Sequence, residues 1–306
     1  PIKKMKYVLA LCGLLLFGCS SKESAEKPKI AVVISTLNNP WFVVLGESAV
    51  KNAEKLGYEA KLFDSQNNPS TESDHFENLI SSGFDAILFN PTDADGSIAN
   101  ILKAKEAGIP VFCMDREVNS NDAATSQILS DNYTGCVAIG VEFVKQLHGK
   151  GNYVEILGLA GDNNTYARSN GFHTVVDKFK SLKMLGQQNG DFDRNKAMEV
   201  MESMMQANPD LQAVFCGNDA MALGAYQAIQ SAGKSQQIKV FGFDGADEVV
   251  QKIKEGKIVA TGMQYPKIMA KTAAEFAVEY FKGRKDFPQH IPVAVNLVNS
   301  KTAKHY

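Results

Sequence analysis

Amide, carboxylate and guanidinium side chains stand directly after several apolar runs of this sequence, each of which is typical of a buried strand. Carboxylates accept hydrogen bonds from hydroxyl groups, guanidinium groups donate them in a fixed fork, and carboxamides do both. Together they can satisfy a small polyhydroxylated ring. Each alone is more often a helix cap or a turn residue, but their recurrence at six strand ends favours a shared binding site. The residues are Asn39, Asn90, Asp115, Arg116, Asn218, Asp244 and Gln264.

Aromatic residues accompany these polar groups. Trp41 and Phe42 follow the first strand-end amide, Phe192 lies in the segment GDFDR, and Phe243 lies in FGFDG. Flat rings can lie against the weakly apolar faces of a sugar, so this pairing of planar polar groups with aromatic faces predicts a carbohydrate site. Trp41 and Phe42 could instead be core residues of the first helix, and these two residues alone leave that alternative open.

The amino terminus has the pattern of an export signal. Lys3, Lys4 and Lys6 precede an apolar run over 7–17, and a polar tract follows it. The run is shorter than the roughly 20 residues that cross a bilayer as a helix, so we expect no transmembrane anchor. We predict a signal peptide over 1–18, a polar linker over 19–28, and a periplasmic or extracytoplasmic location.

The end of this segment, Leu-Phe-Gly-Cys at 16–19, resembles the lipobox of bacterial lipoproteins. The resemblance implies that Cys19 becomes the lipidated first residue of the mature chain, which the membrane would then hold through that lipid alone. Phe17 is bulkier than the residue usual at its position. Ordinary signal cleavage, with Cys19 incidental, is the alternative.

The composition is that of an exported globular protein. A net charge of −2 with both signs interspersed gives no electrostatic footprint for nucleic acid. Cys113 and Cys216 lie in apolar strand patterns, so we expect buried thiols there and at Cys136, although one disulfide is compatible with an oxidising compartment. No cysteine spacing typical of a metal site occurs, and we expect no cofactor.

Short apolar strands alternate with amphipathic helices along the rest of the chain, which indicates parallel strands joined by helical crossovers. The alternation repeats, so the chain divides into two similar halves. Ligands of such sheets bind beyond the carboxyl ends of the strands, where the polar residues lie. The predicted strands are 30–35, 58–64, 86–90, 110–115, 152–158, 184–188, 213–218, 239–245, 259–264 and 292–298; the predicted helices are 41–56, 70–82, 96–107, 135–148, 166–180, 194–207, 220–232, 246–255 and 268–281.

Longer motifs connect these halves to a known family. The chain resembles the bacterial periplasmic ribose-binding proteins, of the pentose- and hexose-binding family that serves ABC importers, in the blocks VISTLNNPWF, LFDSQNNP, FNPTDAD, SDNYTG, DFDRNKAM, LQAVFCGNDAMALGA, SAGKS and VFGFDG. The resemblance implies an α/β fold of two doubly wound parallel-sheet domains joined by a three-crossing hinge. The implied N-terminal domain is 29–130 plus 265–294, and the C-terminal domain is 131–264 plus 295–306.

The same resemblance implies that a monosaccharide, D-ribose before others, is captured between the domains by hinge closure and passed to the membrane permease of an ABC importer. Allose, xylose or a furanose-like quorum signal is the alternative, because Trp41 replaces the phenylalanine of the ribose-binding pattern. Arg168 is matched through a loop, GDNNTYARSNGF, that departs from the family's more arginine-rich version. The implied ligand contacts are Asn39, Trp41, Phe42, Asn90, Asp115, Arg116, Arg168, Phe192, Asn218, Phe243, Asp244 and Gln264.

Other functional classes fit less well. For an enzyme, Asp115 and Asp244 could be glycosidase carboxylates, but the resemblance makes them hydroxyl-binding groups, and the sequence has no nucleophile elbow or complete phosphate-binding loop. A sugar-responsive transcription regulator would carry a DNA-reading headpiece where this chain has an export signal. A binding protein that feeds a chemoreceptor or a sensor kinase would use the same pocket, and that alternative stays open. We expect a monomer.

Overall fold

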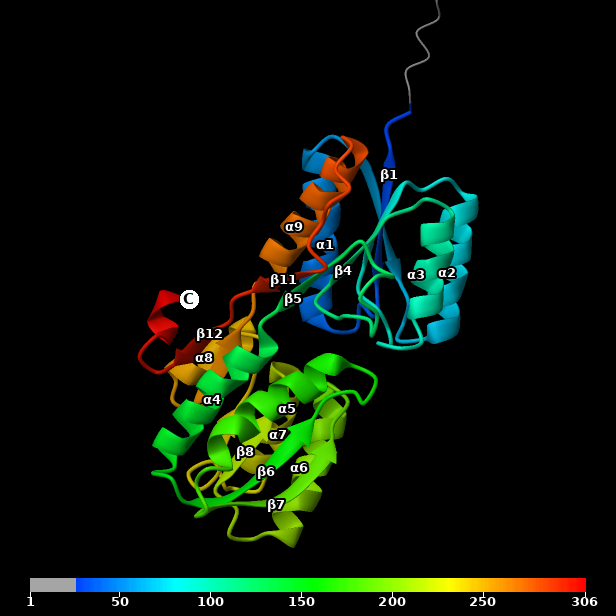
Figure 1. The fold of residues 1–306 in the computed structure, drawn as a ribbon. Helices are drawn as coiled ribbons and strands as arrows, with labels where there is room; N and C mark the ends of the chain where they lie inside the picture. The colour runs from blue at the N-terminus through cyan, green and yellow to red at the C-terminus, as the bar shows by residue number, and fades with distance from the viewer. Residues whose placement is uncertain (1–25) are drawn as a thin grey trace, which may run out of the picture.

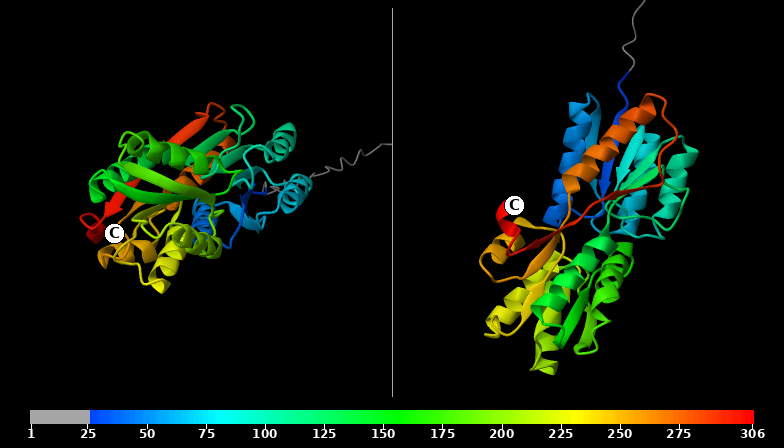
Figure 2. Two further views of the ribbon diagram at one scale, coloured as in Figure 1. Left: turned by 90° about the horizontal axis from the view of Figure 1, so that it is seen from below. Right: turned by 60° about the vertical axis from the view of Figure 1, so that its left-hand side comes forward.

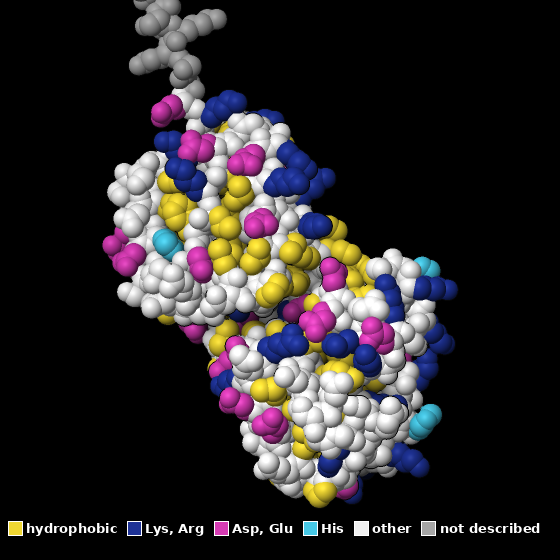
Figure 3. All heavy atoms as spheres, turned by 180° about the vertical axis from the view of Figure 1, so that it is seen from behind, with side chains coloured by type: hydrophobic (Ala, Val, Ile, Leu, Met, Phe, Trp, Pro, Cys, Tyr) yellow, Lys and Arg dark blue, Asp and Glu magenta, His cyan; other side chains and the backbone are white. Residues whose placement is uncertain are grey.

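The computed structural model describes residues 26–306, which form two lobes joined end to end (Figure 1). The predicted signal peptide at 1–18, Cys19 and all of the predicted linker except residues 26–28 lie outside the described residues. Within 26–306, none of the helices combines the length and the apolar character needed to span a bilayer. Acidic and basic side chains are interspersed over both lobes on the face shown in Figure 3.

The first lobe is a parallel sheet with helices on both faces. The strand order is β11-β5-β4-β3-β1-β2, and every neighbouring pair is parallel. Helices α1 and α9 cover one face of the sheet, and α2 and α3 cover the other (Figure 1). The elements are β1 (Lys29–Ile34), α1 (Pro40–Lys55), β2 (Glu59–Asp64), α2 (Pro69–Ser81), β3 (Ala86–Phe89), α3 (Ile98–Glu106), β4 (Val111–Met114), β5 (Ser126–Ser130), α9 (Pro266–Phe281) and β11 (His290–Val293).

The second lobe repeats this plan. The strand order is β12-β10-β9-β8-β6-β7, parallel except for the antiparallel edge strand β12. Helices α4 and α5 cover one face, and α6, α7 and α8 cover the other. The elements are α4 (Asn132–Gln146), β6 (Gly151–Leu157), α5 (Asn163–Val176), β7 (Leu182–Asn189), α6 (Arg194–Ala207), β8 (Ala213–Cys216), α7 (Asp219–Ser231), β9 (Lys239–Phe241), α8 (Asp247–Lys254), β10 (Ala260–Met263), β12 (Asn296–Asn299) and the 3-10 turn η1 (Ala303–His305).

Strand β1 shows why the central strands read as uninterrupted apolar runs. Ile30, Val32 and Ile34 pack on the side of α1 and α9, whereas Ala31 and Val33 pack on the side of α2 and α3. Successive side chains of a strand point to opposite faces, so a strand that is covered on both faces must be apolar at every position. The predicted fold class, two α/β domains with parallel sheets, is confirmed.

The chain passes between the lobes three times, between β5 and α4, between β10 and α9, and between β11 and β12 (Figure 2). The prediction of one strand over 292–298 is wrong, because β11 pairs with β5 in the first lobe and β12 pairs with β10 in the second. Strand β5 was missed, since three of the five residues of its sequence SQILS are polar, although Ser126 and Gln127 are buried. Both differences arise because strands pair with partners that lie far away in the sequence.

Cys113, Cys136 and Cys216 are free and buried, and no disulfide joins them within the described chain. Burial raises the pKa of each thiol above its ordinary value. The expectation of buried thiols at these positions is confirmed, and the alternative of a disulfide among them does not agree with the structure.

Candidate functional site

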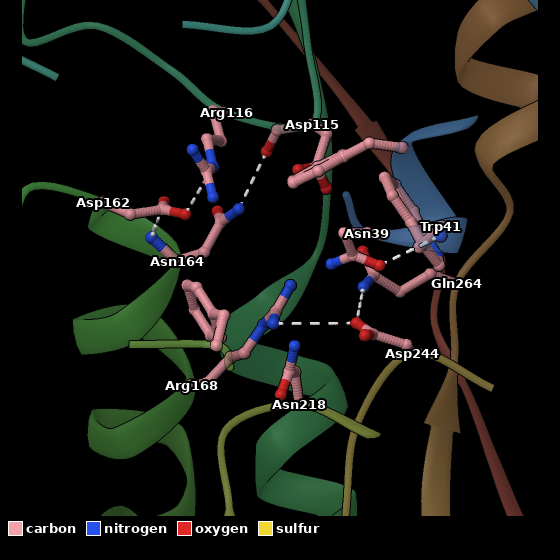
Figure 4. Close-up of a pocket in the computed structure, with 12 residues that line it drawn as sticks. Asn39, Trp41, Asp115, Arg116, Asp162, Asn164, Arg168, Asn218, Asp244 and Gln264 are labelled. Atoms are coloured by element: carbon pink, nitrogen blue, oxygen red, sulfur yellow. Dashed lines mark hydrogen bonds and ion pairs between the residues drawn. The ribbon is translucent and has the colours of Figure 1, made fainter. Parts of the chain in front are cut away.

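A pocket lies between the lobes, beside the carboxyl ends of their strands (Figure 4). The lining comes from both lobes, so a ligand that fills the pocket touches both. The lining residues are Asn39, Trp41, Phe42, Asp115, Arg116, Asp162, Asn164, Arg168, Phe192, Asn218, Asp244 and Gln264.

Asn39 and Asn218 each combine a structural role with a place in the pocket. Oδ1 of Asn39 accepts a hydrogen bond from the backbone N–H of Trp41 at 3.0 Å, and Oδ1 of Asn218 accepts one from Met221 at 2.9 Å. Each side chain therefore caps the helix that follows its strand, as the capping alternative predicted. The amide nitrogens are turned toward the pocket (Figure 4) and can still donate to a ligand.

Asp115 and Asp244 occupy matching places, after β4 in the first lobe and after β9 in the second. Their backbone φ angles are 68° and 141°, values that residues with a side chain rarely adopt and that recur at functional sites. Burial raises the pKa of Asp115 to about 7, although the charge of Arg168 opposes the shift. Burial also raises the pKa of Asp244 well above its ordinary value, again against the charge of Arg168.

Arg168 reaches from α5 to the centre of the pocket. Its Nε donates to Oδ1 of Asn132 at 2.8 Å, and its Nη1 donates to the carbonyl of Gly217 at 2.9 Å. Nη1 also lies 3.7 Å from Oδ1 of Asp244, and the guanidinium carbon lies 4.3 Å from the ring centre of Phe243. These contacts fix the guanidinium, so its remaining N–H groups have a defined direction.

Aromatic rings wall the pocket on both sides. In the first lobe, the Trp41 and Phe42 ring centres lie 5.6 Å apart at 84°, and the guanidinium carbon of Arg116 lies 4.9 Å from the centre of Phe42. Both rings also pack on the first-lobe core, so Trp41 and Phe42 are core residues and pocket residues at the same time. In the second lobe, a Cβ at Gly158 would lie 2.0 Å from the ring of Phe192. The ring can occupy its place only because residue 158 is a glycine.

Apart from Nε of Arg116, which lies 2.7 Å from Oδ2 of Asp162, three buried polar atoms of the lining have no hydrogen-bond partner within residues 26–306: Nε1 of Trp41, Oδ1 of Asp115 and Oε1 of Gln264. One is a donor and two are acceptors. A buried polar atom without a partner costs about 1–3 kcal/mol. Hydroxyl groups both donate and accept, so a polyhydroxylated ligand can satisfy all three atoms.

Asn90 and Phe243, which the family resemblance implied as ligand contacts, lie behind the lining. The Oδ1 atom of Asn90 accepts hydrogen bonds from the N–H and the hydroxyl of Ser35 at 3.2 and 2.6 Å, and its Nδ2 donates to the carbonyl of Met114 at 3.1 Å. Asn90 thereby anchors the end of β4 next to Asp115. Phe243 backs a pocket guanidinium, as described above. The structure gives both residues a supporting position.

Two lining residues, Asp162 and Asn164, were not predicted from the sequence. Nδ2 of Asn164 donates to the backbone carbonyl of Asp115 at 3.0 Å, and Oδ2 of Asp162 lies 2.7 Å from Nε of Arg116 (Figure 4). Both residues follow β6 in the segment GDNN, so they are strand-end polar residues like the others. That position was the signal that could have identified them.

Asp219 lies behind the pocket and organises the loop that carries Asp244. Its carboxylate accepts hydrogen bonds from the N–H groups of Gly245 and Ala246 at 2.9 and 2.8 Å and from the hydroxyl of Thr261 at 2.8 Å. Burial raises the pKa of Asp219 to about 6, with the hydrogen bond from Ala246 opposing the shift. The unusual backbone angle of Asp244 is thus held in place by a buried anion.

Comparison with known proteins agrees with this geometry. Residues 30–285 match the family model described as a periplasmic binding protein domain. The chain is 38% identical over 294 residues to the ribose import binding protein RbsB of Escherichia coli (strain K12), covering 96% of this chain and 98% of that protein. It is 36% identical to the D-apiose import binding protein of Paraburkholderia graminis, covering 96% and 94%.

Solved structures show the same fold. An ABC transporter periplasmic solute binding protein from Actinobacillus succinogenes with bound D-allose is 26% identical, with a TM-score of 0.85 over 92% of this chain and 100% of that one. An ABC transporter solute binding protein from Bacillus halodurans with bound myo-inositol is 26% identical, with a TM-score of 0.88 over 93% and 98%. The chain therefore belongs to the periplasmic binding protein family, among the sugar-binding proteins of ABC importers.

Proposed function

We propose that this protein captures a monosaccharide, D-ribose before others, between its lobes and delivers it to the permease of an ABC importer. The observation that carries the proposal is the set of unpaired buried atoms on Trp41, Asp115 and Gln264, three residues that line a pocket between the lobes. Ring hydroxyls would pair these atoms, and the rings of Phe42 and Phe192 would lie against the apolar faces of the sugar.

The polar residues predicted from the sequence then have roles that follow from their chemistry. Asp115 and Asp244 accept hydrogen bonds from sugar hydroxyls, and Arg116 and Arg168 donate to hydroxyl or ring oxygens. Asn39, Asn218 and Gln264 supply amide donors and acceptors. Asn90 and Phe243 act indirectly, because they hold Asp115 and Arg168 in place.

Two observations bear on which sugar is bound, and they favour different sugars. D-Ribose is favoured because the relatives with 38% identity over 294 residues are ribose import binding proteins. Another pentose or hexose is favoured by Trp41, a lining residue that stands where the ribose-binding pattern has phenylalanine and that has a buried N–H without a hydrogen-bond partner. A relative named for D-apiose import is 36% identical to this chain, and a relative named for D-allose binding is 29% identical.

Capture would occur by hinge closure around the ligand, of which periplasmic binding proteins are the familiar case. The full set of hydrogen bonds forms only when both lobes meet the sugar, so binding favours the closed form. A permease can recognise loading through that closed face. Loss of growth on the sugar after gene deletion would support the importer role, whereas loss of chemotaxis alone would support the chemoreceptor alternative.

We further propose that residues 1–18 are removed on export and that Cys19 is lipidated. The support is the basic, apolar and small-residue order of the segment. Mass spectrometry of the membrane-bound mature protein would show a lipid-modified amino-terminal Cys19, and C19A would move the protein to the soluble fraction. An unmodified amino terminus beyond Cys19 would refute lipidation.

A thermal-shift screen against pentoses and hexoses tests the proposed function directly. A ligand that binds only the folded protein adds about 4 kcal/mol of apparent stability at 1,000 times its Kd, so the correct sugar should raise the melting temperature in a concentration-dependent way. Incubation of the same samples should return the sugar unchanged, since we propose no turnover. A flat response across the panel would refute monosaccharide binding.

A further inference from the structure

Several polar contacts join the lobes along one side of the pocket, and we call this group the latch. The first-lobe partners lie after β3 and β4, and the second-lobe partners lie in the segment 161–164 that opens α5. The latch contacts are Arg116 Nε to Asp162 Oδ2 at 2.7 Å, Asn164 Nδ2 to the Asp115 carbonyl at 3.0 Å, Asn163 Nδ2 to Glu117 Oε1 at 2.9 Å and Asn119 Oδ1 at 2.7 Å, and Ala94 N–H to the Gly161 carbonyl at 3.0 Å.

Asp162 is held rigidly from the side of its own lobe. Its Oδ1 accepts a hydrogen bond from the backbone N–H of Asn164 at 2.9 Å, so it is the amino-terminal cap of α5. The positive end of the helix dipole favours the ionised carboxylate there. The other oxygen, Oδ2, faces Arg116 across the cleft (Figure 4).

Arg116 is held on several sides. Asp162 lies against Nε, Nη1 donates to the carbonyl of Pro91 at 3.4 Å, and the guanidinium carbon lies 4.9 Å from the ring centre of Phe42. The N–H of Nε is not aligned for a good hydrogen bond, so the contact with Asp162 is chiefly one between charges. Both side chains of the pair are only 3–4% exposed, so water screens that attraction weakly.

An uncharged sugar cannot neutralise a buried guanidinium, and Asp115, with its pKa raised to about 7, is a weak counter-charge near neutral pH. Asp162 is the carboxylate in direct contact with Arg116. We infer that Asp162 is a positioning residue that supplies the counter-charge of Arg116 when the lobes close and thereby couples closure to sugar recognition. This inference rests on the proposed function, since it concerns the same pocket.

The test uses D162N, because asparagine caps a helix as well as aspartate does but carries no charge. R116Q and the double variant complete a thermodynamic cycle, and D74N on the exposed side of α2 is the matched control. We expect D162N to weaken binding of the sugar selected by the thermal screen at least tenfold, measured by calorimetry. The same change in the R116Q background should have little further effect.

The sugar-free proteins separate this role from a structural one. The latch forms only when the lobes meet, so the melting temperatures of sugar-free D162N and wild type should agree within about 1 °C. Wild-type affinity in D162N, additive losses in the double variant, or a melting temperature that falls together with affinity would overturn the inference. A wild-type protein that binds no sugar would refute the proposed function and the inference with it, whereas a wild type and a D162N protein that bind the sugar equally well would refute the inference alone.

Discussion

Asp115 and Asp244 are buried carboxylates at equivalent strand ends, one in each lobe. Each has an unusual backbone angle that backbone hydrogen bonds secure, Asp115 to Ile128 and Asp244 to Gly262. Such strain persists where the surroundings determine the conformation and the side chain has a task. At the residue scale, the two halves of the chain therefore place the same chemistry on opposite sides of one ligand.

Replacing Asp115 with asparagine should weaken sugar binding by about 1–3 kcal/mol, which is about fivefold to 150-fold in Kd. Asparagine keeps the shape of the side chain but has one acceptor oxygen fewer, so a sugar hydroxyl loses its partner. Titration calorimetry of D115N against wild type measures the loss, with D74N as the exposed control of the same chemical change. Unchanged affinity would remove Asp115 from the site.

Sugar affinity should depend on pH through Asp115, whose pKa burial raises to about 7. Sugar hydroxyls donate to the ionised carboxylate, so binding must release a proton below this pKa, and affinity should fall on the order of tenfold from pH 8.5 to pH 5.5. The stability of the sugar-free protein should change in the opposite direction. A carboxyl group whose pKa is raised by folding lowers the free energy of unfolding as pH rises toward that raised pKa. Calorimetry over this range checks the prediction, and D115N should flatten the profile.

At the scale of elements, helix α5 has two working faces. Its inner side carries Asp162, Asn164 and Arg168 into the pocket, whereas its outer side carries His173 onto β6. The ring nitrogens of His173 lie 2.8 Å from Oε2 of the buried Glu155 and 2.8 Å from Oδ1 of Asp177. The outer contacts fasten the helix that positions the ligand-binding side chains.

The hydrogen bond to Glu155 raises the pKa of His173 to about 9. A histidine whose pKa is higher in the folded state stabilises the fold fully below its ordinary pKa near 6.5, and that contribution is lost as pH rises through 9. H173Q should therefore lower the free energy of unfolding by about 1–3 kcal/mol at pH 6 and by less at pH 10. Urea unfolding at both pH values measures this, and an equal loss at both would contradict a charged His173.

At the scale of the whole molecule, ligand contacts are divided between two lobes that three chain crossings connect. We expect small-angle scattering to show a smaller radius of gyration when the sugar is present at saturation, because closure brings the lobes together. D244N, which weakens the contacts of the second lobe with the sugar, should need a higher sugar concentration for the same decrease in radius. An unchanged radius at saturation would argue for a pocket that is closed before the ligand arrives.

The sequence by itself determined the alternation of strands and helices, the two parallel-sheet lobes and the polar residues at strand ends, because these patterns are local. Tertiary structure alone decided that β11 and β12 enter different sheets, that Asn90 and Phe243 stand behind the lining, and that Asp162 meets Arg116. These facts depend on contacts between segments far apart in the chain. The raised pKa of Asp115 has the same origin, since the burial of its carboxyl group depends on segments far apart in the chain.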